Sequence, residues 1–295
     1  TAGVQSNGES WQSGISTNIA NQTHSLHFMA DKSEGDDLEF QADGDQTIDA
    51  TEHSKIHYGA GYGLNLGAHE IEFNYERHET DEAGNPSLPS DTILIDTDIY
   101  SLKHRGNIGE LKVDSSVFHQ SVDHEMDNFT VRPATNFFDP KDFPIQPAPP
   151  PVQNAFGGFD RRLILVGSDT TGGDISIAQP LESGSLEYGA EFLRDEYNTN
   201  VRDPDSMFFV TPFNDVERFR YSSFIEWKGP VSDQWSVQTG IRVGQVKSDA
   251  DEVTPPGLPP AINLANQFND ADRDKTDTLF DASLILKRPL TEAIE

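Results

Sequence analysis

The sequence predicts an all-β protein, in which antiparallel strands form part of a transmembrane β-barrel. Apolar and polar residues alternate along most segments, aromatic residues lie near the segment ends, and short turns alternate strictly with long loops. Alternation with a period of two is typical of strands, because successive side chains point to opposite faces of a sheet. An apolar outer face, a polar inner face and aromatic residues near the strand ends are typical of outer-membrane barrels.

The clearest pair of strands lies in residues 218–246. One face of its first strand is mainly apolar and aromatic, with Phe219, Tyr221, Ser223, Ile225 and Trp227. We expect that face to meet lipid. The turn is expected at residues 228–234, with Trp227 and Trp235 at the periplasmic interface of the membrane. The charged residues of this hairpin are expected to face the lumen of the barrel, and they are Arg218, Arg220, Glu226 and Arg242.

Nine further segments are predicted to be strands, with alternation that is less regular in residues 161–177 than in the others. In chain order they are residues 11–19, 26–30, 56–66, 71–76, 93–102, 111–117, 161–177, 186–192 and 280–286. Together with the hairpin they give eleven strands, and a short stub precedes them at the N-terminus. Within residues 93–102 the apolar side chains change face between Ile99 and Tyr100, which predicts a bulge there.

The connections between these strands sort by length. Short turns are expected near residues 21, 67, 107, 182, 231 and 289, and long polar or proline-rich loops near residues 42, 84, 141, 207 and 261. Tight turns at one end and long loops at the other are typical of a barrel with a periplasmic and an extracellular end. A soluble β-helix or propeller would show a fixed short repeat, and the sequence has none.

The composition excludes several functional classes. The hydrophobic content is 35%, and no segment approaches the roughly 18 consecutive apolar residues of a membrane-spanning helix. The formal net charge of -29 argues against nucleic acid as a partner, because such a surface repels phosphates. The chain has no cysteine, and its Ser, His and Asp residues form no recognisable catalytic motif. We expect neither enzymatic activity nor a resident cofactor.

Candidate metal ligands cluster at the end of one expected strand. They are His119, Asp123, His124, Met126 and Asp127, followed by Asn128 and Arg132. Alternation places His119 and Asp123 on one face and His124 on the other, so one ion could meet all of them only if the loop folds back. Imidazole and thioether groups together suit a soft metal such as copper. The alternative is that residues 126–128 cap the strand and order the loop.

Two other sets of residues have less specific interpretations. His53, His57, His69 and His78 are scattered along hairpins and are interpreted as solvated or lumen-facing side chains. The acidic residues between positions 36 and 49 could bind calcium, but they lack the fixed spacing of a calcium loop, so solvated charge is the simpler interpretation.

Short motifs resemble the β-barrel of TonB-dependent outer-membrane receptors. One is H-E-M-D-N-F at residues 124–129, followed by Arg132, and another is G-N-P-S-L-P-S-D at residues 84–91. Both look like segments of a copper-type subfamily, in which methionine often stands at the position of Ser90. A third is G-A-E-F at residues 189–192, which resembles a strand that follows a long mid-barrel loop.

The resemblance implies a barrel of about 22 strands around a plugged lumen. Residues 1–295 would then be part of the barrel domain, with the plug domain and the C-terminal strands absent from this sequence. It also implies a receptor in the outer membrane of a Gram-negative bacterium that takes up a scarce metal or metal chelate, either copper or an iron-siderophore. The expected partners are TonB, through the absent plug, the metal or chelate, and outer-membrane lipid and lipopolysaccharide. The alternatives are a passive porin-type channel and a soluble all-β binding protein.

Overall fold

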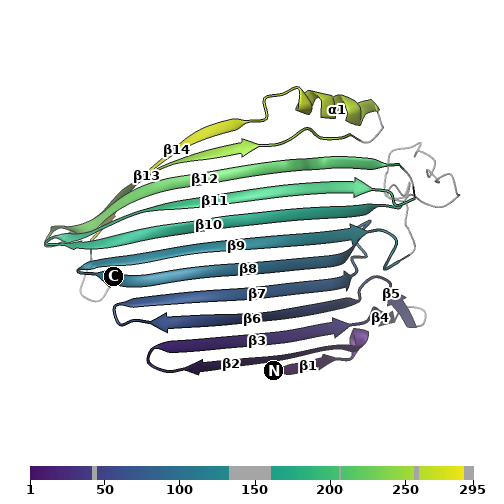
Figure 1. Ribbon diagram of the computed structural model, residues 1–295, viewed down its shortest axis with the longest axis horizontal. Helices are drawn as coiled ribbons and strands as arrows, with labels where there is room; N and C mark the ends of the chain where they lie inside the picture. Colours follow the sequence, from purple (N-terminus) through teal and green to yellow (C-terminus); the bar gives the residue numbers. More distant parts are fainter. Residues whose placement is uncertain (42–44, 133–160, 206, 256–258, 289–295) are drawn as a thin grey trace.

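The computed structural model describes residues 1–41, 45–132, 161–205, 207–255 and 259–288. These residues form a twelve-stranded antiparallel sheet in which the strand order follows the chain (Figure 1). The strands of this sheet are β1 (Ala2–Gln5), β2 (Ser10–Ala20), β3 (His24–Gly35), β6 (His53–Asn65), β7 (His69–Ala83), β8 (Asp91–Ile108), β9 (Leu111–Asp127), β10 (Leu163–Leu181), β11 (Gly184–Arg202), β12 (Phe209–Ser232), β13 (Trp235–Asp249) and β14 (Lys275–Lys287).

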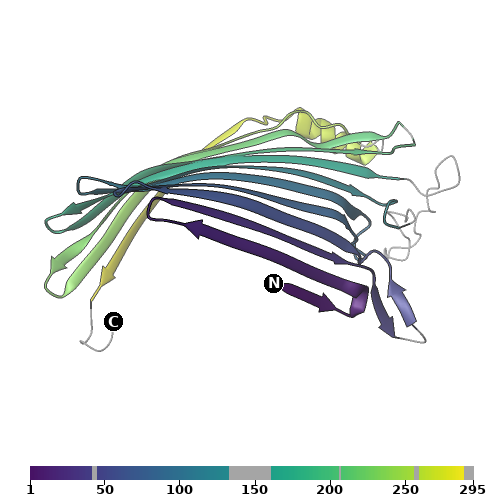
Figure 2. The ribbon, with the colours of Figure 1, turned by 60° about the horizontal axis from the view of Figure 1, so that its bottom comes forward.

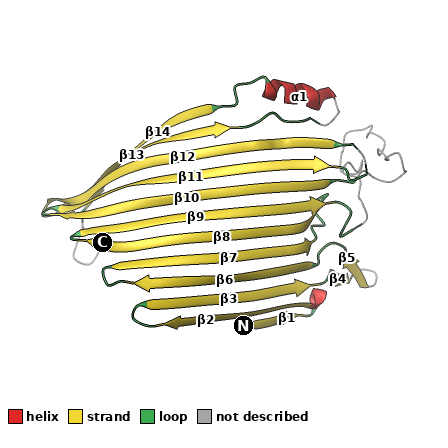
Figure 3. Cartoon of the chain, in the orientation of Figure 1, coloured by secondary structure: helices red, strands yellow, loops and turns green. Residues whose placement is uncertain are grey.

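The prediction of eleven strands and an N-terminal stub is confirmed, with β1 as the stub. The sheet bends along its width into an arch (Figure 2), and strand dominates the chain (Figure 3). Among the described residues, β1 and β14 are the two edges of the sheet. An open, curved antiparallel sheet is what part of a β-barrel would form, so the structure agrees with the predicted fold class (Figure 2).

The two ends of the sheet differ, as the connections predicted. Tight turns join the strands at one end, and the opposite end carries a small hairpin and a helix (Figure 1). The hairpin consists of β4 (Leu38–Gln41) and β5 (Asp45–Ile48), and the helix is α1 (Pro259–Asn269). Both lie in segments that were expected to be loops. The expected turn near residue 289 and most of the proline-rich loop near residue 141 lie outside the described residues.

Several strands are longer than predicted. Residues 198–215 were expected to form a loop, but β11 continues to Arg202 and β12 begins at Phe209 and runs for 24 residues. Pairing continues past irregularities between Tyr197 and Thr199 and between Thr199 and Val201. A barrel strand needs about 9–11 residues to cross a membrane, so these strands are long enough to extend well beyond one.

Two local predictions were wrong. The turn after β12 is shorter than residues 228–234, because β12 ends at Ser232 and β13 begins at Trp235. Trp227 is thus paired inside the ladder with Thr239. In β8 the register shifts between Thr92 and Leu94 rather than at Ile99. The apolar Ile95 and Ile99 therefore belong to the face opposite Tyr100.

The large sheet has two chemically different faces. We call the face with Phe28, Tyr62, Phe73, Ile175 and Ile225 the apolar face, and the opposite face the polar face. Many large apolar side chains are exposed, including Ile15 at 74% and Phe280 at 67%. Among the described residues, the buried apolar side chains are limited to Ala50, Val113, Val210 and Ala265. Soluble proteins rarely expose so extensive an apolar surface to water. The apolar face is therefore expected to contact lipid or another apolar surface.

No helix within the described parts of the chain has both the length and the hydropathy needed to cross a membrane.

Candidate functional site

The ends of β8 and β9 carry the most completely buried polar side chains among the described residues. Asp91 and Asp127 are cross-strand partners that are 0% and 2% exposed, and the neighbouring Asn128 is 0% exposed. Burial of a carboxylate costs free energy unless the group is paired or hydrogen-bonded. The partners of these side chains therefore determine how this region is stabilised.

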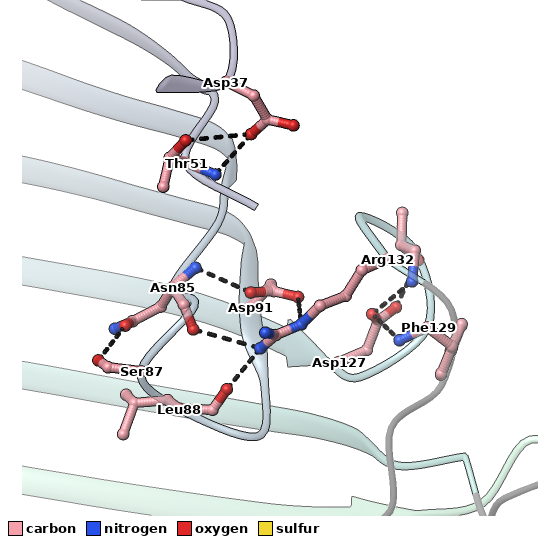
Figure 4. A network of polar contacts seen from close by, with 10 residues as sticks. Asp37, Thr51, Asn85, Ser87, Leu88, Asp91, Asp127, Phe129 and Arg132 are labelled. Atoms are coloured by element: carbon pink, nitrogen blue, oxygen red, sulfur yellow. Dashed lines mark hydrogen bonds and ion pairs between the residues drawn. The ribbon is translucent and has the colours of Figure 1, made fainter. Parts of the chain in front are cut away.

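Arg132 joins the two motifs that resemble receptor segments (Figure 4). Its Nε lies 2.9 Å from Oδ2 of Asp91, and its Nη2 donates to the carbonyl oxygens of Asn85, at 3.2 Å, and of Leu88. Asp91 also accepts a hydrogen bond from the backbone N–H of Asn85 at 2.8 Å. The segment 84–91 is thereby fastened to the segment that follows β9.

Asp127 and Asn128 order the start of the same loop. Oδ1 of Asp127 accepts the backbone N–H groups of Phe129, at 2.9 Å, and of Thr130, at 2.8 Å, while its Oδ2 accepts the Thr130 hydroxyl at 2.5 Å. Oδ1 of Asn128 accepts the N–H of Arg162 at 2.8 Å, just before β10. These contacts agree with the alternative that this segment caps the strand and orders the loop.

His124 and Met126 stand apart from that network, on the polar face of β9. Their cross-strand partners in β10 are Val166 and Ile164, so they lie side by side along the strand. The Nε2 atom of His124 is buried, with no hydrogen-bond partner among the described residues. A buried nitrogen without a partner next to a thioether is a suitable start for a soft-metal site.

The structure divides the seven sequence-predicted ligands into three groups. His124 and Met126 share the polar face, while Asp127, Asn128 and Arg132 hold the loop. His119 and Asp123 lie on the apolar-face side of β9. The Nδ1 atom of His119 is 2.9 Å from the Thr171 hydroxyl, and its Nε2 is 3.8 Å from Asp169.

The four residues predicted to face the lumen share the polar face. Arg218, Arg220 and Glu226 alternate along β12, and Arg242 is the partner of Phe224 on the same face. Arg242 Nη1 lies 2.7 Å from Glu191 Oε1, and Glu226 Oε1 accepts a hydrogen bond from Gln238 at 2.9 Å. Residues of β9 to β14 line a groove there, among them Asp174, Glu191, Arg220, Ser222, Arg242 and Asp281.

Asp37 and Glu52 form a carboxylate pair at the end of the sheet that carries the long loops, near residue 84. Burial, together with a hydrogen bond to Asp37, raises the pKa of Glu52 to about 7. Burial acts to raise the pKa of Asp37 as well, but hydrogen bonds from the Thr51 backbone and from Glu52 outweigh it, so the pKa of Asp37 is lowered. The Thr51 N–H donates to Asp37 at 2.7 Å (Figure 4). Glu52 is therefore the member of the pair whose pKa lies near neutral pH.

Sequence reasoning missed one group of possible metal ligands. His57 and His78, which were interpreted as scattered residues, lie together with Glu76 on β6 and β7. The expected turn near residue 67 carried the signal, because a hairpin centred there pairs His57 with His78.

Comparisons with known proteins give a match in structure and none in sequence. No family model and no curated protein matches the chain. A solved structure named copper transporter OprC superposes with a TM-score of 0.71 at 16% identity, over 97% of this chain and 42% of that one. The FrpB iron transporter from Neisseria meningitidis gives a TM-score of 0.60 at 13% identity, over 97% of this chain and 43% of that one.

A third similar structure is the ferric yersiniabactin uptake receptor FyuA from Yersinia pestis. It gives a TM-score of 0.60 at 12% identity, over 99% of this chain and 44% of that one. The chain spans less than half the length of these three solved chains. At this level of identity the likeness concerns the fold, and for the fold it confirms the resemblance that the motifs indicated. The chain has the fold of part of the β-barrel of TonB-dependent outer-membrane receptors.

Proposed function

We propose that residues 1–295 are part of the barrel domain of a TonB-dependent receptor that takes up a scarce metal or metal chelate across a Gram-negative outer membrane. The observation that carries the proposal is the large sheet itself, with one exposed apolar face and one charged face. Its fold is shared with a copper transporter and an iron transporter. The plug domain and the remaining strands of the barrel would lie elsewhere in the protein.

The apolar face supports a location in the membrane. Tyr58, Tyr75 and Tyr100 lie together on this face, with the Tyr75 and Tyr100 rings 4.9 Å apart. One position further along β7, on the same face, Arg77 pairs with Asp98 at 2.7 Å and with Asp96 at 2.8 Å. Tyrosines followed by charges are the pattern expected where a strand leaves the hydrocarbon layer. The polar face would then line the lumen.

Arg77, Glu79, Asp96 and Asp98 form a charged belt on this face. Lipopolysaccharide is the proposed neighbour of this belt. Arg77 also pairs with Glu79, so one guanidinium faces three carboxylates. Because the belt is negative on balance, contact with anionic lipid phosphates would require bridging divalent cations.

Copper is the ligand that the local chemistry favours. His124 and Met126 offer an imidazole and a thioether on the polar face, and these groups together suit copper better than a hard cation. The name of one similar structure, a copper transporter, agrees with this choice. Ligands from a plug domain would complete such a site, since two barrel residues leave coordination positions open.

Uptake of a ferric chelate is the second candidate. Arg220 and Arg242 line a groove on the polar face, and arginine is suited to bind the carboxylates of an anionic chelate. The groove also contains Asp174, Glu191 and Asp281, so its charge is mixed. The similar structures include a receptor for ferric yersiniabactin.

Uptake of radioactive copper by cells that carry His124→Ala or Met126→Ala tests the assignment. Each variant is expected to reduce uptake at limiting copper about tenfold or more, since loss of even an outer partner of a metal ligand costs about 10–100-fold in affinity. His27→Ala, at an exposed position on the polar face of β3, is the matched control with unchanged uptake. Equal uptake by all three variants would contradict the ligand assignment.

Coupling to TonB is tested separately in the same assay. Deletion of TonB is expected to abolish concentrative uptake while the receptor stays in the outer membrane. Uptake that continues at the same rate without TonB would instead indicate a passive channel.

A further inference from the structure

A second group of metal-binding side chains lies on the polar face of β6 and β7. His57 and His78 are cross-strand partners, and Glu76 is the next residue on the same face of β7. One ligand atom from each of the three residues lies within 4.8 Å of the others. The two imidazole rings are nearly parallel, at 8°, with their centroids 4.0 Å apart.

Asp31 orients the first imidazole. Oδ1 of Asp31, on the neighbouring β3, lies 3.0 Å from Nδ1 of His57. A proton on Nδ1 leaves the lone pair of Nε2 free, and the Nε2 atom is buried with no hydrogen-bond partner among the described residues. A carboxylate that holds one histidine nitrogen while the other nitrogen binds a metal is the usual arrangement in metalloproteins.

The distances leave room for one ion. Glu76 Oε2 lies 3.8 Å from Nε2 of His57 and 3.7 Å from Nε2 of His78. These separations are too long for hydrogen bonds. Two ligands bound at about 2.0–2.2 Å to a tetrahedral metal lie about 3.3–3.6 Å apart. The stacked rings direct their nitrogen lone pairs along nearly parallel lines, so binding of one ion by all three atoms requires the imidazoles to rotate toward Glu76 as well as small shifts of the ligand atoms.

The surroundings favour entry of a soft metal. Gly59 has no side chain, and a Cβ built on it would lie 3.1 Å from both Cγ of Glu76 and Cε of Met29. The glutamate and the methionine thus lie over the glycine, which places a thioether at the border of the cluster. The side chain of His57 is 23% exposed and that of His78 is 44% exposed. Both imidazole side chains are therefore partly exposed on the polar face, while Nε2 of His57 is itself buried.

We propose that His57, Glu76 and His78 bind one divalent transition-metal ion, copper or zinc, with Asp31 as a positioning residue. Two imidazoles and one carboxylate suit these metals and not calcium or magnesium, which prefer oxygen ligands alone. The site is distinct from His124 and Met126, which lie on β9. It depends on the sheet alone and does not rest on the proposed transport function.

Titration of the purified protein in detergent with Cu²⁺ and Zn²⁺ salts tests the site. All variants carry His124→Ala, so that binding at β9 does not contribute. Against that background His57→Ala and His78→Ala are expected to weaken Cu²⁺ binding by about 100-fold or more, and Asp31→Asn by about tenfold. His27→Ala, which removes an imidazole from the polar face of β3, is the control with unchanged affinity.

Electron paramagnetic resonance of bound Cu²⁺ provides a readout beyond affinity. The spectrum is expected to show coupling to two imidazole nitrogens, and to one in either histidine variant. If the histidine variants fail to fold, Glu76→Gln keeps the shape of the side chain, removes its charge and is expected to weaken binding at least tenfold. Equal affinity and an equal spectrum in the control and in the His57, His78 or Glu76 variants would overturn the proposal, and the imidazoles would then be a stacked pair without metal.

Discussion

Arg132 and Asp91, 41 positions apart in the sequence, form an ion pair of 2.9 Å in which the carboxylate is fully buried. The pair joins the first residue of β8 to the segment after β9, at the end of the sheet that carries the long loops. The sequence indicated the motifs at residues 84–91 and 124–132 separately. The contacts of Arg132 fix the position of one relative to the other. The loop near His124 and Met126 is held by these contacts.

Loss of this pair is expected to loosen that end of the barrel. Asp91→Ala leaves the Arg132 guanidinium without its carboxylate, and breaking a buried pair costs about 3–5 kcal/mol. Hydrogen exchange of residues 84–91 should accelerate, while exchange in β12 and β13 stays unchanged. Arg105→Ala breaks a pair with Asp114 whose side chains are 69% and 56% exposed, and it should change exchange little. Equal effects of the two variants would contradict the structural role of Arg132.

The raised pKa of Glu52 predicts that the stability of residues 36–52 depends on pH. Its pKa in the folded protein is about 7, raised from 4.5 by burial and by the hydrogen bond with Asp37. A carboxyl with a raised pKa stabilises the fold in its protonated form, so its contribution is fully present below about pH 4.5. That contribution is lost as the pH rises through 7.

Proteolysis of residues 36–52 at pH 5.5 and pH 8 measures this effect. Cleavage is expected to be faster at pH 8 in the wild type, and Glu52→Gln should reduce the difference. Glu39→Gln, in the neighbouring hairpin, is the control that keeps the wild-type difference. A pH dependence that persists in the Glu52 variant would show that another group causes it.

Gly184 and Gly109, both in turns, are expected to differ in how well they tolerate replacement by alanine. Gly184 has φ of 112°, and a Cβ there would clash with the Lys228 carbonyl oxygen. Gly109 has φ of 63°, with no atom within 4 Å of its Cβ position. Gly184→Ala should lower the unfolding temperature clearly, whereas Gly109→Ala adds only the cost of a left-handed alanine, about 1–2 kcal/mol. Thermal unfolding in detergent compares them, and equal losses would contradict the turn geometry.

The parts of the fold that the sequence predicted correctly are those with one apolar face. Ile225 and Ile241 alternate with polar neighbours, and this contrast identified β12 and β13. The outer parts of β11 and β12 were missed because the period of two breaks down there: β11 ends in mainly polar residues, and β12 begins with the irregular run F-V-T-P-F-N-D. Asn198 and Asn200, for example, pair with Gly167 and Leu165 in the ladder, yet they look like loop residues.

The candidate site could be predicted in part. Alternation alone correctly separated His119 and Asp123 from His124, because it depends only on position within one strand. The Arg132–Asp91 pair depends on how two loops fold, which local pattern does not determine. The His57–His78 pair required the register of one hairpin, and a shift of one residue would have separated the rings. Sequence reasoning placed the turn near residue 67 but did not extend it to the pairing.

The apolar face of the sheet is expected to meet lipid, and the polar face to line the lumen. The chain has no cysteine, so single cysteines at residues 219–227 can carry a spin label without background. In bilayers, labels at 219, 221, 223, 225 and 227 should be accessible to oxygen dissolved in lipid, and labels at 220, 222, 224 and 226 to a water-soluble nickel chelate. A period of two with these phases is the predicted result. Equal access of the nickel chelate to Ile225 and to Ser222 would contradict the account.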